Sequence, residues 1–198
     1  VITYGTQSNL QERLVAAEIR TYPFMHGPIH EMLDFMLDLG RELRLETAGR
    51  QLADNIRGKL DALRSGAPER RPRVLLVHSR KVGTIRSFYS GGSESFFNEL
   101  IDIAGGVNIF GDVRDDSIQP SLEEVLRRQP EIIIELLPSN KDDPDQINQR
   151  IQDWEQLEIL LAVQQGRVHV LTGDYLLLVG PRLHLAAERF ADVIRRKQ

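Results

Sequence analysis

The sequence predicts an α/β fold in which a mainly parallel sheet lies between two layers of helices. Strand-length apolar runs alternate with segments of helical periodicity from Val74 to the end of the chain, an order typical of parallel α/β sheets. These runs are continuously apolar, as expected for strands buried on both faces. A polar stretch rich in Gly and Pro, 65–72, separates this part from a helical segment and a short β–α–β segment before it.

Composition narrows the classes of function. The chain has 198 residues, with 25 Lys and Arg against 29 Asp and Glu, and no cysteine. The small negative net charge argues against a nucleic-acid partner, which would require a basic surface. The absence of cysteine excludes a disulfide framework, a thiol nucleophile and a cysteine-ligated cluster. No apolar run reaches the roughly 18 residues that a membrane helix needs.

Residues 1–27 are predicted to form a minimal β–α–β unit. Val1–Tyr4 is a β-branched and aromatic run, Ser8 opens a helix, and Ile19–Tyr22 forms a second strand that Pro23 stops. Two strands do not make a stable domain alone. Because the chain opens inside a strand, we expect a truncated or processed product whose targeting segment lies upstream.

Residues 28–72 are predicted to be helical up to the linker. One helix follows Pro28 and is expected to be interrupted at Gly40. A second helix, Glu46–Arg64, would be roughly 28 Å long at 1.5 Å per residue. Leu52, Ile56, Leu60 and Leu63 are in helical register and many of the other positions are charged, so we expect a surface helix that lies across another element.

Residues 73–198 are predicted to form the α/β sheet domain. The predicted strands are Val74–Val77, a short Val107–Phe110, Ile132–Leu137 and Val168–Leu171. The predicted helices are Glu94–Ala104 and three that begin near Ser121, Asp143 and Pro181. The segment Ser79–Ser93 is expected to be a long loop after the first strand.

Motifs for enzyme chemistry are weak. No G-x-G-x-x-G or G-x-x-x-x-G-K-[ST] occurs, and the serines of 91–95 are misplaced for a nucleophile elbow. Two interpretations of 91–95 stay open: an ordinary turn before a helix, or a loop whose Ser93 and backbone N–H groups line a ligand pocket. His78 lies at a strand end, where α/β proteins often bind ligands, although a structural hydrogen bond also accounts for it. No catalytic residue and no metal site are predicted.

Two adjacent glutamates open the helix after Ser121. Glu124 is at the capping-box position and can bond back to Ser121. Glu123 has no such structural role and is expected to point to solvent. It is therefore free for a partner.

Four segments, in order and at matching spacing, resemble class III periplasmic binding proteins of the TroA-like, helical-backbone type. They are the helix with its A-G-G-x-N turn (98–110), the segment similar to S-L-E-x-[IVL]-L…P-D-[VLI]-I-[VI] (121–134, with Glu131 at the Asp position), the W-x-x-L…A-V-x-x-G-R-V segment (154–168) and the G-P-R turn (180–182). The resemblance implies a Rossmann-like three-layer lobe and the substrate-binding component of an ABC importer. Its ligand would be a metal chelate, namely an iron–siderophore, cobalamin or haem.

The resemblance also implies roles for particular residues. Glu123 falls at the glutamate that docks on the permease. The ligand would lie in a cleft between two lobes and be gripped by loops at strand ends. The expected ligand-binding residues on those loops are Tyr4, His78, Arg86, Phe88, Tyr89, Ser93 and Tyr175. No cofactor is implied, since the chelate is cargo.

The resemblance further divides the chain into three parts. Residues 1–27 would be a remnant of an N-terminal lobe, 28–72 a helical segment with the bridging helix and linker, and 73–198 the C-terminal lobe. Such a protein would be periplasmic, or extracellular and lipid-anchored. The isolated chain would expose faces that the missing lobe covers and so be prone to form a non-native dimer or to aggregate.

Two other functions are weighed against this one. A nucleotide-binding enzyme domain, such as half of a glycosyltransferase, would need a phosphate-cradling turn after the first strand, and 79–93 is too long and too rich in Arg and aromatics for that. A receptor-like sensor domain would share the fold and differ only in what is fused to it.

Overall fold

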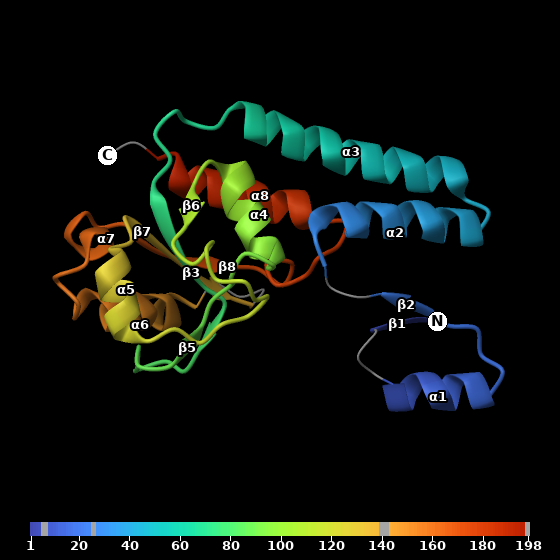
Figure 1. Ribbon diagram of the computed structural model, residues 1–198, viewed down its shortest axis with the longest axis horizontal. Helices are drawn as coiled ribbons and strands as arrows, with labels where there is room; N and C mark the ends of the chain where they lie inside the picture. Colours follow the sequence, from blue (N-terminus) through green and yellow to red (C-terminus); the bar gives the residue numbers. More distant parts are fainter. Residues whose placement is uncertain (5–7, 25–26, 139–142, 197–198) are drawn as a thin grey trace.

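A four-stranded parallel sheet forms the centre of the larger part of the molecule (Figure 1). The computed structural model describes residues 1–4, 8–24, 27–138 and 143–196. The strand order is β6–β3–β7–β8, with bounds Val107–Asn108, Arg73–Val77, Ile132–Leu137 and Val168–Thr172. β7, at the centre, is buried along its whole length. The α/β fold predicted from the continuous apolar runs is thus confirmed.

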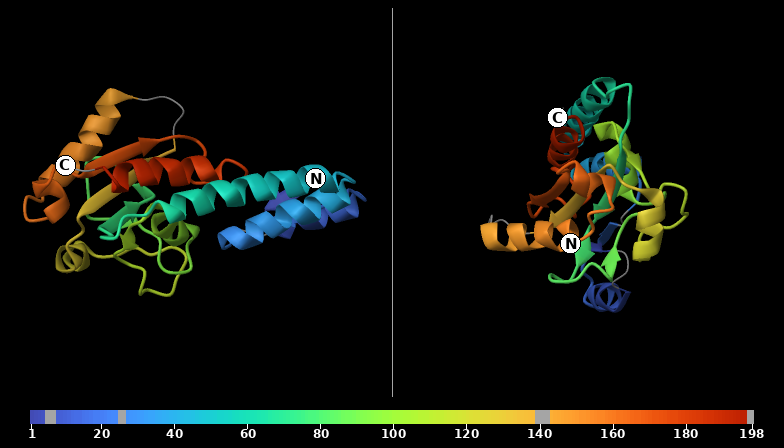
Figure 2. Two further views of the ribbon diagram at one scale, coloured as in Figure 1. Left: turned by 90° about the horizontal axis from the view of Figure 1, so that it is seen from above. Right: turned by 90° about the vertical axis from the view of Figure 1, so that its left-hand side faces the viewer.

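Helices cover both faces of this sheet (Figure 2). One layer contains α4 (Phe96–Ala104) and α8 (Leu183–Ile194). The other contains α5 (Leu122–Arg128), α6 (Pro144–Glu155) and α7 (Leu161–Gln164). Alternate residues of each strand point to opposite faces, so Val74 and Leu76 join the core under α4 and α8 while Leu75 and Val77 join the core around Trp154.

Two long helices form a hairpin beside the sheet. α2 (Ile29–Glu42) packs against α3 (Glu46–Ser65), and α3 continues across α4 and α8. The expected interruption at Gly40 is wrong, because α2 runs through it. Gly40 instead lies where the helices cross: a methyl group added there would lie 3.1 Å from the Gly49 Cα. The missing side chains let the two backbones approach closely.

The N-terminal segment packs on the opposite side of α2 from α3 (Figure 1). β1 (Ile2–Tyr4) and β2 (Tyr22–Phe24) pair in parallel, and α1 (Ser8–Ala16) connects them. Phe24 holds this pair to α2 through Phe35, with ring centroids 4.8 Å apart. Pro23 was expected to end the second strand, but it lies inside β2. A proline is tolerated there because β1 is the only strand that pairs with β2 in the described sheet.

The segment after β3 is also more regular than expected. It contains an antiparallel pair, β4 (Ser79–Arg80) and β5 (Phe88–Tyr89), in place of a continuous loop. Among the described residues, no helix is both long enough and apolar enough to span a membrane.

Candidate ligand-binding surface

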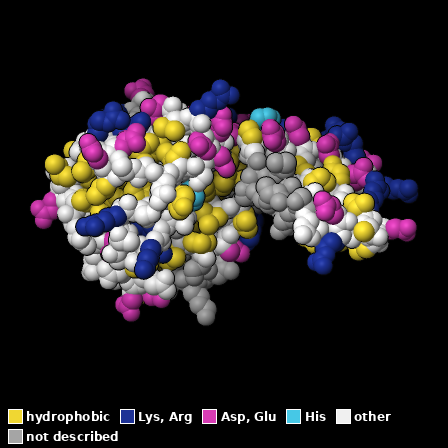
Figure 3. Space-filling view, turned by 60° about the horizontal axis from the view of Figure 1, so that its bottom comes forward, with side chains coloured by type: hydrophobic (Ala, Val, Ile, Leu, Met, Phe, Trp, Pro, Cys, Tyr) yellow, Lys and Arg dark blue, Asp and Glu magenta, His cyan; other side chains and the backbone are white. Residues whose placement is uncertain are grey.

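The carboxyl ends of β3 and β8 lead into the segments that carry most of the predicted ligand residues. In an open parallel sheet, ligands bind outside these ends. Figure 3 views the molecule from the side on which the β4–β5 pair lies, where both hydrophobic and Lys or Arg side chains reach the surface of the larger body.

His78 follows β3 directly and is held on three sides. Its backbone N–H donates to the Tyr89 carbonyl oxygen at 3.0 Å. Its ring stacks on Phe97 at a centroid distance of 5.5 Å, and Nε2 lies 3.4 Å from the Ser117 hydroxyl. Burial lowers the pKa of His78, so the imidazole is neutral near pH 7. The half-buried ring is also hydrogen-bonded by the backbone of Ser90, and a neutral imidazole is able to hydrogen-bond a ligand or coordinate a metal in one.

Arg86 and Tyr89 offer a cation and a flat surface. Tyr89 is 44% exposed, and its ring centroid lies 6.2 Å from that of His78. Arg86 is exposed. Within the described part of the chain its guanidinium makes no hydrogen bond or ion pair, and only its backbone N–H is engaged, by Thr84. A free guanidinium suits carboxylate or other anionic oxygens.

Phe88 does not belong to this surface. It was expected among the ligand residues, but it is fully buried and packs edge-on against Trp154 at 5.7 Å. Successive residues of a strand face opposite ways, so exposure of Tyr89 requires burial of Phe88. We therefore exclude it.

Ser93 is engaged within the protein. Its hydroxyl donates to the Val113 carbonyl oxygen at 3.1 Å and its backbone N–H donates to the same oxygen at 2.8 Å. These bonds tie the turn before α4 to the segment 110–118. Ser117, which the sequence did not single out, reaches His78 through that segment.

Tyr175 lies in the segment after β8. It is half-buried, and the Arg182 guanidinium lies 5.8 Å from its ring centroid. Arg182 is fixed in turn by Asp174 at 3.0 Å. Gly173 has φ of +152° and a methyl group there would meet the Tyr175 ring at 2.8 Å, so the turn requires glycine. The Tyr4 side chain lies outside what the structure describes.

Glu123 lies at the start of α5. Ser121 caps this helix by accepting the Glu124 N–H at 3.2 Å. The Glu124 carboxylate was expected to bond back to Ser121. It instead accepts a hydrogen bond from Arg128 at 3.0 Å. Glu123 is exposed and, in the ranges that the structure covers, has no ion pair or hydrogen bond. Its negative charge near a helix N-terminus is favourable.

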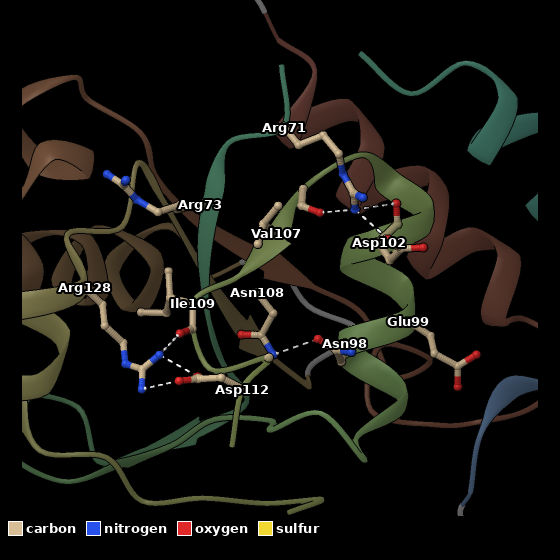
Figure 4. Close-up of a pocket in the computed structure, with 12 residues that line it drawn as sticks. Arg71, Arg73, Asn98, Glu99, Asp102, Val107, Asn108, Ile109, Asp112 and Arg128 are labelled. Carbon is tan, nitrogen blue, oxygen red and sulfur yellow. Dashed lines mark hydrogen bonds and ion pairs between the residues drawn. The ribbon is translucent and has the colours of Figure 1, made fainter. Parts of the chain in front are cut away.

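A separate hollow of about 720 Å³ runs along β6, between α4 and α5 (Figure 4). Two of its arginines are already paired with carboxylates. Arg71 binds Asp102 at 2.6 Å and Arg128 binds Asp112 at 2.6 Å. The same two arginines also donate to the carbonyl oxygens of Gly106 and Ile109 beside the free edge of β6.

The edge of β6 in this hollow is therefore closed by charged side chains. Covering the edge with charged side chains prevents pairing with another chain. Glu99 on α4 also lines the hollow (Figure 4), and its carboxylate accepts the Ile29 N–H at 2.9 Å. Glu99 thereby satisfies a backbone N–H at the start of α2 and ties this helix to α4.

Comparison with known proteins identifies the fold. The family model described as periplasmic binding protein matches residues 1–175. The chain belongs to the periplasmic binding protein family.

Solved structures of similar fold include periplasmic solute-binding proteins. One is a possible iron-binding periplasmic solute-binding protein from Staphylococcus epidermidis, with a TM-score of 0.82 and 21% identity over 98% of this chain and 75% of that one. Another is IsdE of S. aureus complexed with haem, with a TM-score of 0.75 and 18% identity over 99% of this chain and 76% of that one. The vitamin B12-binding protein BtuF of Vibrio cholerae has a TM-score of 0.74 and 23% identity over 98% of this chain and 72% of that one.

Proposed function

We propose that this periplasmic binding protein is the substrate-binding component of an ABC importer and captures a metal chelate. The observation that carries the proposal is the segment that follows β3, on which His78, Arg86 and Tyr89 lie. It combines a neutral imidazole, a free guanidinium and an exposed ring. Siderophores present anionic oxygens to a guanidinium, and tetrapyrroles present a face to an aromatic ring.

The known neighbours support this ligand class. The S. epidermidis protein is described as iron-binding, IsdE is complexed with haem, and BtuF binds vitamin B12. Haem and vitamin B12 are metal chelates, and iron is a metal that such chelates carry. Tyr175, beside Arg182, would contribute a second ring from the segment after β8, and Tyr4 would contribute from the end of β1.

Delivery requires a docking surface for the permease. We assign this role to Glu123, because it is exposed, charged and without a partner in the described structure. A permease would meet it with a basic pocket. The protein would then act in the periplasm, or outside the cell on a lipid anchor.

The three-part organisation belongs to the same proposal. Residues 73–198 would form one lobe, 28–72 the helical segment that bridges the lobes, and 1–27 part of the second lobe. Exposed apolar side chains gather on residues 1–27, among them Ile2 and Val15. We expect them to drive a non-native dimer of the isolated chain, which light scattering after size exclusion would detect.

Titration with three probes tests the ligand class. The chain is titrated with ferrichrome, cyanocobalamin and haemin, following Trp154 fluorescence and visible absorbance. We expect saturable binding of one probe that weakens about ten-fold or more in Arg86→Ala and in Tyr89→Ala, the loss of one charged or aromatic contact. Arg50→Ala, which removes an exposed arginine from α3, is the control. Absence of saturation with every probe, or equal loss in Arg50→Ala, contradicts the proposal.

A further inference from the structure

A cluster of four charged side chains is buried beneath the ligand-binding surface. Arg80 and Glu135 are 0% and 1% exposed, and Asp153 is 3% exposed. Arg80 donates through Nε to Glu135 and through Nη1 to Asp153, each at 2.7 Å. Arg150 pairs with the other oxygen of Glu135. The cluster joins β4, β7 and α6 and holds two positive and two negative charges, so it is neutral as a whole.

Stability alone does not account for this cluster. Glu135 interrupts the run Ile-Ile-Ile-Glu-Leu-Leu of the most buried strand, where an aliphatic side chain would pack well. Burying ions is costly, and replacing a buried ion pair by apolar residues is often neutral or stabilising. A buried ionic group instead gives directional bonds that fix a particular geometry.

The geometry that it fixes is the turn between β4 and β5. Arg80 Nη1 also donates to the carbonyl oxygens of Thr84 and Lys81, at 3.3 and 3.4 Å. Asp153 Oδ2 accepts the backbone N–H of Gly83 at 2.8 Å. Three backbone groups of the turn are thus bonded to the cluster, and Arg86 follows two residues later.

Trp154 contacts the cluster from a further side. Its Nε1–H donates to Glu135 Oε2 at 2.9 Å, and the Arg80 guanidinium lies 5.8 Å from its ring centroid. Trp154 also packs against Phe88, the inward neighbour of Tyr89. It is the single tryptophan of the chain, so tryptophan fluorescence reports on the surroundings of this cluster.

We propose that Arg80 and Asp153 are positioning residues, which hold the 81–87 turn so that Arg86 and Tyr89 face the ligand. This inference rests on the proposed function for its ligand, but the positioning itself is independent of it. Burial raises the pKa of Asp153, yet the hydrogen bonds from Arg80 and the Gly83 N–H outweigh this and leave it lowered. The carboxylate therefore stays charged and able to hold the turn at neutral pH.

A charge-balanced double variant tests the proposal. Arg80→Met alone would leave a net buried charge and could unfold the chain. Arg80→Met with Asp153→Leu removes one charge of each sign and leaves the Arg150–Glu135 pair in place. We expect it to fold with an unchanged or higher urea midpoint. Arg195→Met is the control, since Arg195 binds the carbonyl oxygens of Leu63 and Ala104 in the other helix layer.

Hydrogen exchange gives the decisive readout. In the double variant, amides of 81–87, Gly83 above all, should exchange about ten-fold faster or more, while amides of β7 and β8 keep their protection. Arg195→Met should leave 81–87 unchanged. Trp154 emission should shift in the double variant only. Unchanged protection of 81–87, or an equal increase across β7 and β8, overturns the proposal.

The ligand titration separates this inference from the proposed function. Whichever of ferrichrome, cyanocobalamin and haemin saturates the wild-type chain should bind the double variant about ten-fold or more weakly. Full affinity despite a loosened turn overturns the link between the turn and the ligand. If no probe binds the wild-type chain, the proposed function fails, and hydrogen exchange still decides whether the cluster holds the turn.

Discussion

Replacing Gly49 with alanine tests whether the crossing of α2 and α3 depends on a missing side chain. The new methyl group would lie 3.0 Å from the Met36 carbonyl oxygen and 3.1 Å from the Gly40 Cα. Both are backbone atoms of a packed helix and cannot rotate aside, so the helices must separate. Gly58 provides the matched control, because it lies in the same helix and a methyl group there meets no atom within 4 Å.

The expected magnitudes follow from two opposing effects. Alanine is favoured over glycine inside a helix by about 1 kcal/mol, which applies at both positions. Overpacking costs about 1–3 kcal/mol and applies only at Gly49. Gly58→Ala should therefore raise the free energy of unfolding by about 0.5–1 kcal/mol. Gly49→Ala should be about 1–3 kcal/mol less stable than Gly58→Ala.

Thermal and urea unfolding followed by far-UV circular dichroism measure the difference. For a chain of 198 residues, each kcal/mol shifts Tm by about 2–4 °C. Gly58→Ala should melt at least about 2 °C above Gly49→Ala. Equal stabilisation by both substitutions would refute the reasoning, because it would mean that the helices absorb the methyl group without loss of packing.

Three further predictions concern a cap, a titration and the closed strand edge. Ser121→Ala should lower the free energy of unfolding by about 1 kcal/mol through loss of the α5 cap, whereas Glu123→Ala should change it by less than about 0.5 kcal/mol; urea titration compares them. Burial lowers the pKa of His169 from 6.5, and the nearby charges of Arg167 and Arg196 lower it further. The contribution of the neutral His169 to the free energy of unfolding is therefore complete above pH 6.5 and is lost as pH falls below that value. His169→Gln should flatten this pH dependence in urea midpoints measured from pH 7.5 to 5. Arg71→Ala should accelerate aggregation in light scattering by exposing the β6 edge, and an unchanged rate would contradict the edge assignment.

The sheet could be predicted from the sequence because its determinants are local. The inner strands are largely apolar runs, and the helices that come after them in the chain have a periodicity and caps that are readable in a short window. Ser121 is one example, since its side chain caps α5 as the pattern indicates.

The features that sequence reasoning missed depend on distant partners. Gly40 looks like a helix breaker until Gly49 is placed against it. Glu135 stands in an apolar run with no local sign of its partner, because Arg80 lies 55 positions away along the chain. Phe88 and Tyr89 are adjacent aromatics, and only the pairing of β5 with β4 decides which one is exposed.

That pairing links the ligand surface to the buried cluster. The register places Arg80 opposite Phe88 and Ser79 opposite Tyr89. The first pair faces inward, and both of its members contact Trp154. A slip of one residue would exchange the two faces, moving Tyr89 into the core and Phe88 to the surface. The ionic bonds of Arg80 oppose this slip, because no other position of β4 could reach Glu135 and Asp153 together. The chemistry offered to a ligand is therefore set by a register that buried charges, and not exposed residues, hold in place.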